Sequence, residues 1–195
     1  MIEVGSRDIN GSLRSIIESM GPIEYVGVDA VPGPGVDRVC EVDNIARLFG
    51  ENSFDLVVST EVLEHVRNWR SAVSTLKAVC KRNGLLILTT RSVGFPYHGY
   101  PSDFWRYEPE DLQEIFSDME ILEIERDRKA VPGVFAKIRK PADFEERSTS
   151  SYQLYSIIAG GRVVDITPRD IRRFMLLRSI SKRLTVLATK LGDAI

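Results

Sequence analysis

Cysteine is scarce in this sequence, and neither cysteine lies in a metal-binding or redox motif. Cys40 and Cys80 stand apart, with no Cys-x-x-Cys pair, so we interpret both as buried thiols in a reducing compartment. The start of the chain lacks a basic region followed by an apolar core, and no apolar run approaches the roughly 20 residues that a membrane-spanning helix needs. These absences predict a cytoplasmic protein.

A large excess of positive charge is also missing. The 26 Lys and Arg are outnumbered by 28 Asp and Glu, for a net charge of −2, which argues against a dedicated nucleic-acid-binding protein. The 195 residues, 43% of them hydrophobic, suffice for one globular domain with a substantial core. Basic residues gather at the end, where residues 162–195 hold eight Lys and Arg against three Asp. This shift marks a tail with its own packing or its own role.

Short apolar runs alternate with helical patterns along most of the chain. A helix capped by Asn10, a helical region from Glu61 to about Lys81 that Gly84 ends, and a helix opened by residues 108–111 separate the runs. We predict an α/β fold: a Rossmann-like, doubly wound, mostly parallel seven-stranded sheet with an antiparallel closing strand, plus a C-terminal helical tail. The predicted strands span residues 2–4, 25–28, 36–42, 54–58, 85–90, 120–126 and 134–139.

Polar residues follow the predicted strands at the edge of the sheet where ligands of doubly wound folds bind. The first strand leads into Glu3-Val4-Gly5-Ser6-Arg7, in which Gly5 permits a tight turn and the Glu3 carboxylate is placed to order it. Arg7 stands where a dinucleotide fingerprint has its second glycine, which disfavours close approach of a pyrophosphate. The turn predicts a nucleoside ligand without phosphate, and a plain strand-to-helix turn is the alternative.

The next two strand ends carry acidic and amide side chains. Asp29 ends the second strand, where a carboxylate accepts hydrogen bonds from ribose hydroxyls or caps a helix. Asp43 and Asn44 follow the third strand and are suited either to an adenine amino group or to helix capping.

Taken together, these residues resemble class I S-adenosylmethionine-dependent methyltransferases, in particular the type 11 methyltransferase-domain group. The resemblance covers about residues 2–140 and implies a methyltransferase domain over residues 1–140, followed by a C-terminal extension over residues 141–195. Arg7 and Ile9 depart from it, since many members have Gly there. It is carried by Glu3-x-Gly5-Ser6, Val28-Asp29, Asp43, the run Ser59-Thr60-Glu61-Val62-Leu63-Glu64-His65-Val66, and Gly84 to Thr90.

The resemblance implies an enzyme that moves a methyl group from S-adenosylmethionine to an oxygen or nitrogen of a small-molecule, sugar or lipid-linked acceptor. A catalytically degenerate fold that serves as a binding or interaction module is the alternative. A nicotinamide-dependent oxidoreductase is disfavoured by the missing glycines. The implied cofactor-binding residues are Glu3, Gly5, Ser6 and Arg7 at the methionine end, Asp29 and Ala30 at the ribose, Asp43 and Asn44 at the adenine, and Ser59, Thr60 and Glu61 beside the sulfonium.

His65, with Glu64 beside it, is the candidate catalytic proton acceptor; alternatively, the two residues only fix the segment after the fourth strand. Glu61, Glu64 and His65 have the i, i+3, i+4 spacing of one helical face, and His98 follows the fifth strand. Some small-RNA 2′-O-methyltransferases and quinone-biosynthesis O-methyltransferases resemble this pattern. There it implies a divalent-metal site for Mg²⁺, and its ligands also suit Mn²⁺ or Zn²⁺.

The segment from Gly94 to Tyr107 is aromatic, polar and rich in proline, a mixture suited to planar or sugar-like ligands. The candidate acceptor-binding residues are Tyr97, His98, Trp105 and Arg106. A structural lid whose Trp105 and Tyr107 pack on the sheet is the alternative. The run Asp103 to Tyr107 also resembles a stretch of methyltransferases linked with surface-polysaccharide metabolism.

Because the first strand begins at residue 2, we expect no helical cap before it, and expect the 91–107 loop, the tail or a second subunit to close the pocket. Pro168 opens a predicted basic amphipathic helix. This pattern predicts that the helix packs on the domain or in a homodimer. Peripheral contact with anionic lipid is the alternative, and contact with nucleic acid is the least favoured. Its apolar stripe is Leu177, Ile180, Leu184, Leu187 and Leu191, with Arg172, Arg173, Arg178, Lys182 and Arg183 largely elsewhere.

Overall fold

The computed structural model describes the chain except for residues 10, 100–101, 128–130 and 193–195, and without the side chains of residues 182–192. A seven-stranded sheet with the order β3-β2-β1-β4-β5-β8-β7 forms its centre. All neighbours pair in parallel except β8, which is antiparallel to β5 and to β7. The strands are β1 (Ile2–Val4), β2 (Val26–Asp29), β3 (Arg38–Val39), β4 (Phe54–Thr60), β5 (Cys80–Arg91), β7 (Glu120–Arg126) and β8 (Gly133–Arg139).

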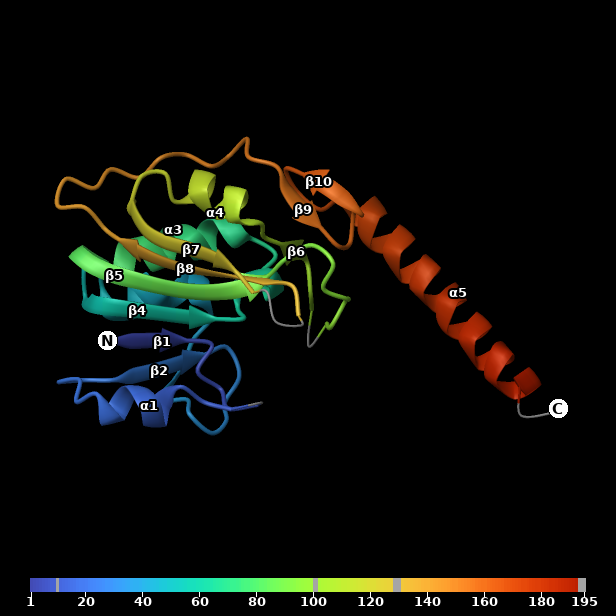
Figure 1. Cartoon of the computed structure of the whole chain (residues 1–195), viewed down its shortest axis with the longest axis horizontal. Coiled ribbons are helices and arrows are strands. Elements are labelled where there is room, and N and C mark those ends of the chain that lie inside the picture. Colours follow the sequence, from blue (N-terminus) through green and yellow to red (C-terminus); the bar gives the residue numbers. More distant parts are fainter. Residues whose placement is uncertain (10, 100–101, 128–130, 193–195) are drawn as a thin grey trace.

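This architecture confirms the predicted doubly wound sheet and its antiparallel closing strand. The carboxyl ends of β1, β2, β4 and β5 point to the same edge (Figure 1). The crossovers between them use short helices, and the tail forms the predicted C-terminal helix, α5. The helices are α1 (Arg14–Ser19), η1 (Val42–Asn44), α2 (Ile45–Phe49), η2 (Leu63–His65), α3 (Trp69–Val79), α4 (Pro109–Ile115) and α5 (Pro168–Gly192).

The core lies between the central strands and α3. Ile2, Val57 and Leu86 come from three adjacent strands, and Trp69 and Leu76 from the helix; all are fully buried. Burying apolar side chains of this size stabilises the fold by about 1.5–3 kcal/mol each. The packing fixes the positions of the strands, and therefore the edge at which they end.

The third strand is much shorter than the predicted run 36–42. Only Arg38–Val39 pairs with β2, and residues Val42–Asn44 turn into a 3-10 helix. Strand pairing stops because the chain bends after Cys40 to bury Val42 and Ile45 in the core. The α/β pattern is unaffected, since β3 is an edge strand.

The helical region predicted from Glu61 to Lys81 is wrong at both ends. Glu61 has a left-handed backbone with φ of +56°, and α3 begins only after Asn68, whose side chain accepts from the Ser71 amide at 3.4 Å. The helix ends at Val79, and Gly84 lies inside β5 rather than at a helix end. A Cβ at Gly84 would come within about 3 Å of the carbonyl oxygens of Lys81 and Asp55, so this strand position has no room for a side chain. The predicted cap Asn10 lies outside the described residues.

A second, three-stranded sheet connects the C-terminal extension to the loop after β5. It has the order β10-β9-β6, with β6 (Trp105–Arg106), β9 (Leu154–Ser156) and β10 (Gly161–Val163). Arg70 on α3 also donates to the carbonyls of Thr149 and Tyr152, at 2.9 and 2.6 Å. The extension is therefore packed against the domain as far as β10, whereas α5 leads away from it (Figure 1).

Among the described residues, no helix is both long enough and apolar enough to cross a membrane.

Candidate functional site

The turn after β1 is closed in a way that only glycine allows. Gly5 has φ of +83°, and a Cβ on it would overlap the Val62 side chain. The amides of Gly5 and Ser6 both donate to the Val28 carbonyl, at 2.8 and 3.1 Å. The turn therefore folds back onto the end of β2 and packs closely against the chain after β4, and this junction of strand ends is named here the cradle.

Two buried hydroxyl groups lie at this cradle without a partner. Ser59 is paired in register with Val4, the residue before Gly5. The Oγ atoms of Ser6 and Ser59 are buried and have no hydrogen-bond partner among the described residues. Buried polar groups are nearly always satisfied in folded proteins, so both hydroxyls are suited to the polar groups of a ligand.

Glu3 lies beneath the same turn and is largely committed to the chain. Its buried carboxylate accepts a hydrogen bond from the Tyr25 hydroxyl. Burial raises the pKa of Glu3, and the bond from Tyr25 offsets only part of that effect. Glu3 therefore fixes the start of β2 against β1.

Asp29 holds together the turns after β1 and β2. One carboxylate oxygen accepts from the Val31 amide at 2.9 Å, and the other lies 3.4 Å from the Arg7 amide. The side chain of Arg7 lies against Gly33, where a Cβ would stand 2.8 Å from the arginine Nε. Arg7 thus packs on the Pro-Gly loop, while Ala30 is exposed.

Asp43 and Asn44 lie in η1, beyond the short β3. Asp43 is exposed and Asn44 is half-buried. Neither side chain makes a capping bond: Glu41 is the N-cap of η1, and Asn44, the N-cap of α2, makes no side-chain cap bond. Both polar groups are therefore available at the edge of the sheet.

Glu61 does not join the group that the i, i+3, i+4 spacing predicted, although its carboxylate stays close to that of Glu64. Its amide still pairs with the Thr89 carbonyl at 3.0 Å, and its left-handed backbone then redirects the side chain. The carboxylate accepts from the Thr89 hydroxyl at 2.9 Å and forms an ion pair with Arg91. Because Glu61 is not in a helix, it does not share a helical face with Glu64 and His65. Thr60, just before it, is half-buried.

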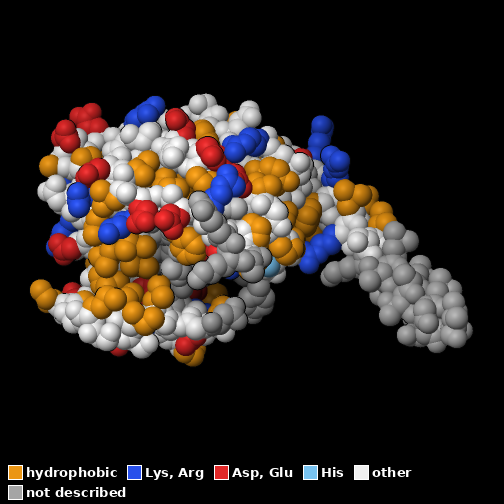
Figure 2. Space-filling model, in the orientation of Figure 1, with side chains coloured by type: hydrophobic (Ala, Val, Ile, Leu, Met, Phe, Trp, Pro, Cys, Tyr) orange, Lys and Arg blue, Asp and Glu red, His pale blue; other side chains and the backbone are white. Residues whose placement is uncertain are grey.

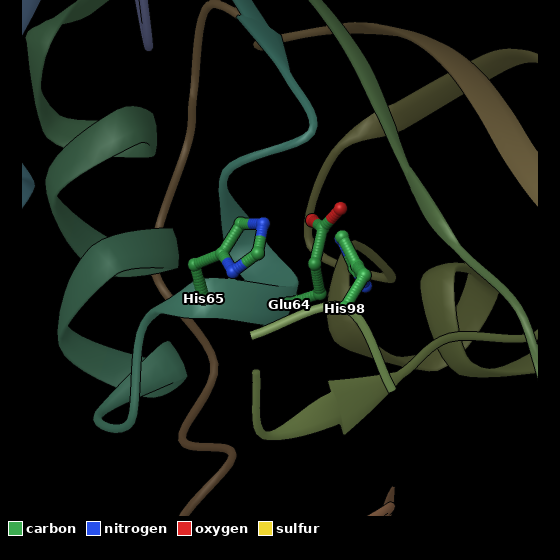
Figure 3. Close-up of side chains that lie close together, drawn as sticks. All are labelled: Glu64, His65 and His98. Carbon is green, nitrogen blue, oxygen red and sulfur yellow. The ribbon is translucent and has the colours of Figure 1, made fainter. Parts of the chain in front are cut away.

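Glu64, His65 and His98 converge from two segments far apart in the sequence. One possible ligand atom from each lies within 4.8 Å of the other two, and in Figure 3 the two imidazole rings stand on either side of the Glu64 carboxyl group. The ring centroids of His65 and His98 are 4.7 Å apart. These three residues, named here the Glu-His-His group, bring together three of the four predicted ligands.

Glu64 is fully buried, and only one of its carboxyl oxygens has a partner. The Thr90 hydroxyl donates to Oε2 at 2.8 Å, whereas Oε1 has no partner among the described residues. Burial, followed by the nearby charge of Glu61, raises the pKa of Glu64 to about 8. Glu64 is therefore protonated at neutral pH unless a cation occupies the group.

The two histidines have different hydrogen-bonding partners. His65 Nδ1 contacts the Ser102 carbonyl, and because a carbonyl only accepts, Nδ1 carries the proton and Nε2 keeps its lone pair. The His98 amide donates to Asp103 at 2.9 Å, and its Nδ1 lies 2.9 Å from the same carboxylate. Burial lowers the pKa of His98, which favours the neutral ring.

Asp103 and Arg106 form a buried frame beneath the loop that carries His98. The Arg106 guanidinium donates to both Asp103 oxygens, at 2.5 and 2.7 Å, and to the carbonyls of Phe95 and Pro96. Burial alone would raise the pKa of Asp103, but Arg106 and the His98 amide hold it below its ordinary value. Sequence reasoning missed Asp103 as a site residue, although its i, i+3 spacing to Arg106 was a usable signal.

The four predicted acceptor residues divide into two pairs. Trp105 and Arg106 are buried in β6, and Trp105 Nε1 donates to the Arg67 carbonyl at 3.0 Å. Tyr97 and His98 are half-buried. The Tyr97 ring lies 5.0 Å from that of Phe174 on α5, with the Arg178 guanidinium 4.0 Å above it.

Comparison with known proteins agrees with the fold. A family model described as "Methyltransferase domain" matches residues 2–128, and no curated protein matches the sequence. A solved structure similar to this chain is the 1,6-didemethyltoxoflavin-N1-methyltransferase of Burkholderia thailandensis, with bound 1,6-didemethyltoxoflavin and S-adenosylhomocysteine. It is 12% identical, and the match has a TM-score of 0.56 over 72% of this chain and 70% of that chain.

Two further similar structures also hold this kind of ligand. The N-methyltransferase NodS of Bradyrhizobium japonicum WM9, in complex with S-adenosylhomocysteine, is 14% identical, with a TM-score of 0.52 over 72% of this chain and 76% of that chain. The Haemonchus contortus phosphoethanolamine N-methyltransferase 2, in complex with S-adenosylmethionine, is 16% identical, with a TM-score of 0.55 over 72% of this chain and 48% of that chain. At such identities the likeness concerns the fold.

Proposed function

The chain belongs to the family described as "Methyltransferase domain", and from that premise we propose that it transfers the methyl group of S-adenosylmethionine to an oxygen or nitrogen of a small-molecule, sugar or lipid-linked acceptor. One observation carries the proposal. The Gly5 turn closes against Val62, and the buried, unpartnered hydroxyls of Ser6 and Ser59 lie at the same strand ends. Such a cradle suits a ligand that brings its own polar groups to the edge of the sheet.

The residues present fit this cofactor. Gly5 and Ser6 would hold its methionine end, Asp29 its ribose, and Asp43 with Asn44 its adenine. Ser59 is paired in register with Val4, the residue before Gly5, and Glu61 follows β4 directly. Three similar structures that bind S-adenosylmethionine or S-adenosylhomocysteine support this choice.

When bound, the cofactor would supply a methyl group already activated, as a sulfonium, for transfer to an acceptor oxygen or nitrogen. The chain has to align the acceptor and take up its proton. His65 is the residue suited to that task, because its Nε2 is unprotonated while Nδ1 is held by Ser102. Glu64 is not, since its raised pKa leaves it protonated at neutral pH.

As an alternative to proton uptake by His65, the Glu-His-His group is suited to a divalent cation. Its possible ligand atoms lie within 4.8 Å of one another, close to the roughly 4 Å that separates opposite ligands of one ion. With Glu61 committed to Arg91, the set is two imidazoles and one carboxylate, which favours Mn²⁺ or Zn²⁺ over Mg²⁺. A cation there would lower the pKa of an acceptor hydroxyl bound to it.

Calorimetric titration of the protein with S-adenosylmethionine, S-adenosylhomocysteine and NAD tests the proposed cofactor. We expect binding of the first two ligands and none of NAD. Binding of NAD alone would favour an oxidoreductase, and binding of none would favour the degenerate interaction module. A Ser59→Ala variant should bind S-adenosylmethionine more weakly, whereas Ser19→Ala, on the distant α1, should not.

The metal is tested separately from the cofactor. Co²⁺ serves as a spectroscopic substitute for Mn²⁺ or Zn²⁺. After bound metal is removed with EDTA, the parent protein should show an absorption band when Co²⁺ is added, and His98→Ala should not. Glu61→Gln should keep the band, because Glu61 lies outside the group. Absence of the band from the parent would refute the metal site and leave the proposed role of His65 untouched.

A further inference from the structure

Helix α5 extends away from the domain (Figure 1). Several of its large apolar side chains are exposed. Met175, Leu176 and Leu177 are each more than half exposed, and Ile180 nearly so. Helices in proteins gain most of their stability from packing an apolar face. Something outside the described chain therefore has to cover this one.

The same helix is strongly basic. Arg169, Arg172 and Arg173 are exposed, and Figure 2 shows arginine and hydrophobic side chains together where the helix leaves the body. Asp170 is the one acid between Pro168 and Ser181, and it accepts from the amide and hydroxyl of Thr167 at 2.8 and 2.6 Å, as the helix cap. The sequence from residue 182 to 192 adds Lys182, Arg183 and Lys190 and no acid.

Basic and apolar residues occupy one face rather than opposite faces. Arg169, Arg173, Leu176 and Ile180 follow one another at spacings of four, three and four residues, which align on a helix. The predicted stripe of Leu177 and Ile180 therefore has arginines on its own side. The predicted stripe residues Leu184, Leu187 and Leu191 have side chains outside the described residues.

This arrangement discriminates between two possible coverings. A second α5 packed on this face would bury Arg169 and Arg173 without an acid opposite them, and an unpaired buried charge is strongly destabilising. A bilayer surface with anionic headgroups accepts both kinds of side chain: the arginines meet the headgroups and the leucines enter the acyl boundary. No helix among the described residues spans a membrane, so α5 would lie on the surface.

We propose that α5 docks on an anionic lipid surface through this face, with the loop of Tyr97 and His98 held against the opposite side of the helix. The contact of Tyr97 with Phe174 and Arg178 joins the helix directly to that loop. His98, the next residue, belongs to the Glu-His-His group. The loop then lies about one helix diameter, roughly 10 Å, from the lipid surface. Resting on the proposed methyl transfer, this short distance favours a lipid-linked acceptor.

Sedimentation of the full chain with vesicles tests the docking. The protein should bind phosphatidylcholine vesicles that contain phosphatidylglycerol, release them at high salt, and ignore pure phosphatidylcholine. Arg169→Gln/Arg173→Gln should weaken binding by about 30-fold, from two lost charges at the surface. Leu176→Ser/Ile180→Ser should weaken it by at least about tenfold.

Matched controls come from exposed residues outside α5. Arg47→Gln on α2 and Ile23→Ser before β2 remove the same kinds of side chain, and both should bind vesicles like the parent. Equal binding by all variants, or binding indifferent to phosphatidylglycerol, would overturn the proposal. So would a dimer in sedimentation velocity that Leu176→Ser/Ile180→Ser dissociates, with no vesicle binding. Calorimetry with S-adenosylmethionine on the same variants separates failure of the docking from failure of the proposed function.

Discussion

Replacement of the buried carboxyl group by an amide in Glu64→Gln should change how stability depends on pH. Glu64 has an ordinary pKa of 4.5 in the unfolded chain and a pKa of about 8 in the folded protein. Between those values the unfolded chain has lost the proton that the folded protein keeps. Stability of the parent therefore falls as pH rises through this range, and the glutamine variant, which cannot ionise, is free of that loss.

The size of the effect follows from the two pKa values. Each unit of separation corresponds to about 1.4 kcal/mol, so a rise from 4.5 to about 8 amounts to roughly 5 kcal/mol in order of magnitude. No discount for solvent screening applies, since the side chain is fully buried. Glutamine retains an oxygen that can accept from Thr90, so the hydrogen bond at 2.8 Å is kept.

Urea denaturation of both proteins across about pH 5 to pH 8 measures the difference in unfolding free energy. The advantage of Glu64→Gln should grow by about 1.4 kcal/mol per pH unit and level off above about pH 8. Asp55→Asn is the control, because a hydrogen bond from the Lys81 ammonium lowers the pKa of that exposed carboxylate. Asp55 is therefore ionised in both states above about pH 5, and its replacement should give a difference that does not change with pH in this range. For Glu64→Gln, a difference that stays flat with pH would refute the reasoning. Saturating Mn²⁺ should abolish the slope in the parent if the Glu-His-His group binds it.

Gly5→Ala should weaken binding of S-adenosylmethionine by roughly tenfold or more, because a left-handed alanine costs about 1–2 kcal/mol and its Cβ would meet the chain after β4. Gly21→Ala, also at positive φ but in open space, is the calorimetric control, and equal affinities would contradict the cradle. Asp103→Asn should speed hydrogen exchange of the His98 amide, which loses its anionic acceptor; unchanged exchange would argue against the frame. A chain ending at Thr167 should keep the melting temperature of the parent, whereas one that ends before β9 should melt lower and bind the cofactor more weakly. Equal melting of the two truncations would contradict a structural role for the small sheet.

The sheet and the strand-end residues could be predicted because both depend on local pattern. Continuous apolar runs such as residues 54–58 are typical of strands buried on both faces. The polar residues that follow them, including Asp29 and Ser59, reach one edge whenever the strands are parallel. Even the closing pair β7 and β8 could be read from two runs joined by Pro132 and Gly133. These features need no knowledge of contacts between distant segments.

The small sheet could not be predicted in this way. Its strands β6 and β9 are short and lie almost fifty residues apart, and their pairing runs from Trp105–Ser156 to Arg106–Tyr155. Neither strand is long enough to show the alternating pattern by which a strand is predicted from sequence. The pairing is a tertiary contact, and it explains why Trp105 is buried rather than exposed to an acceptor.

The mistaken position of Glu61 has a single physical origin that also accounts for the state of the Glu-His-His group. Helical spacing would have placed two carboxylates side by side, and like charges in a buried site cannot both ionise cheaply. The left-handed turn at Glu61 sends one carboxylate to Arg91, where it is paired. The other, on Glu64, stays buried with a raised pKa and holds a proton. The site thus holds one paired charge, on Glu61, beside a protonated acid, Glu64, and the charge of Glu61 helps to keep that proton in place.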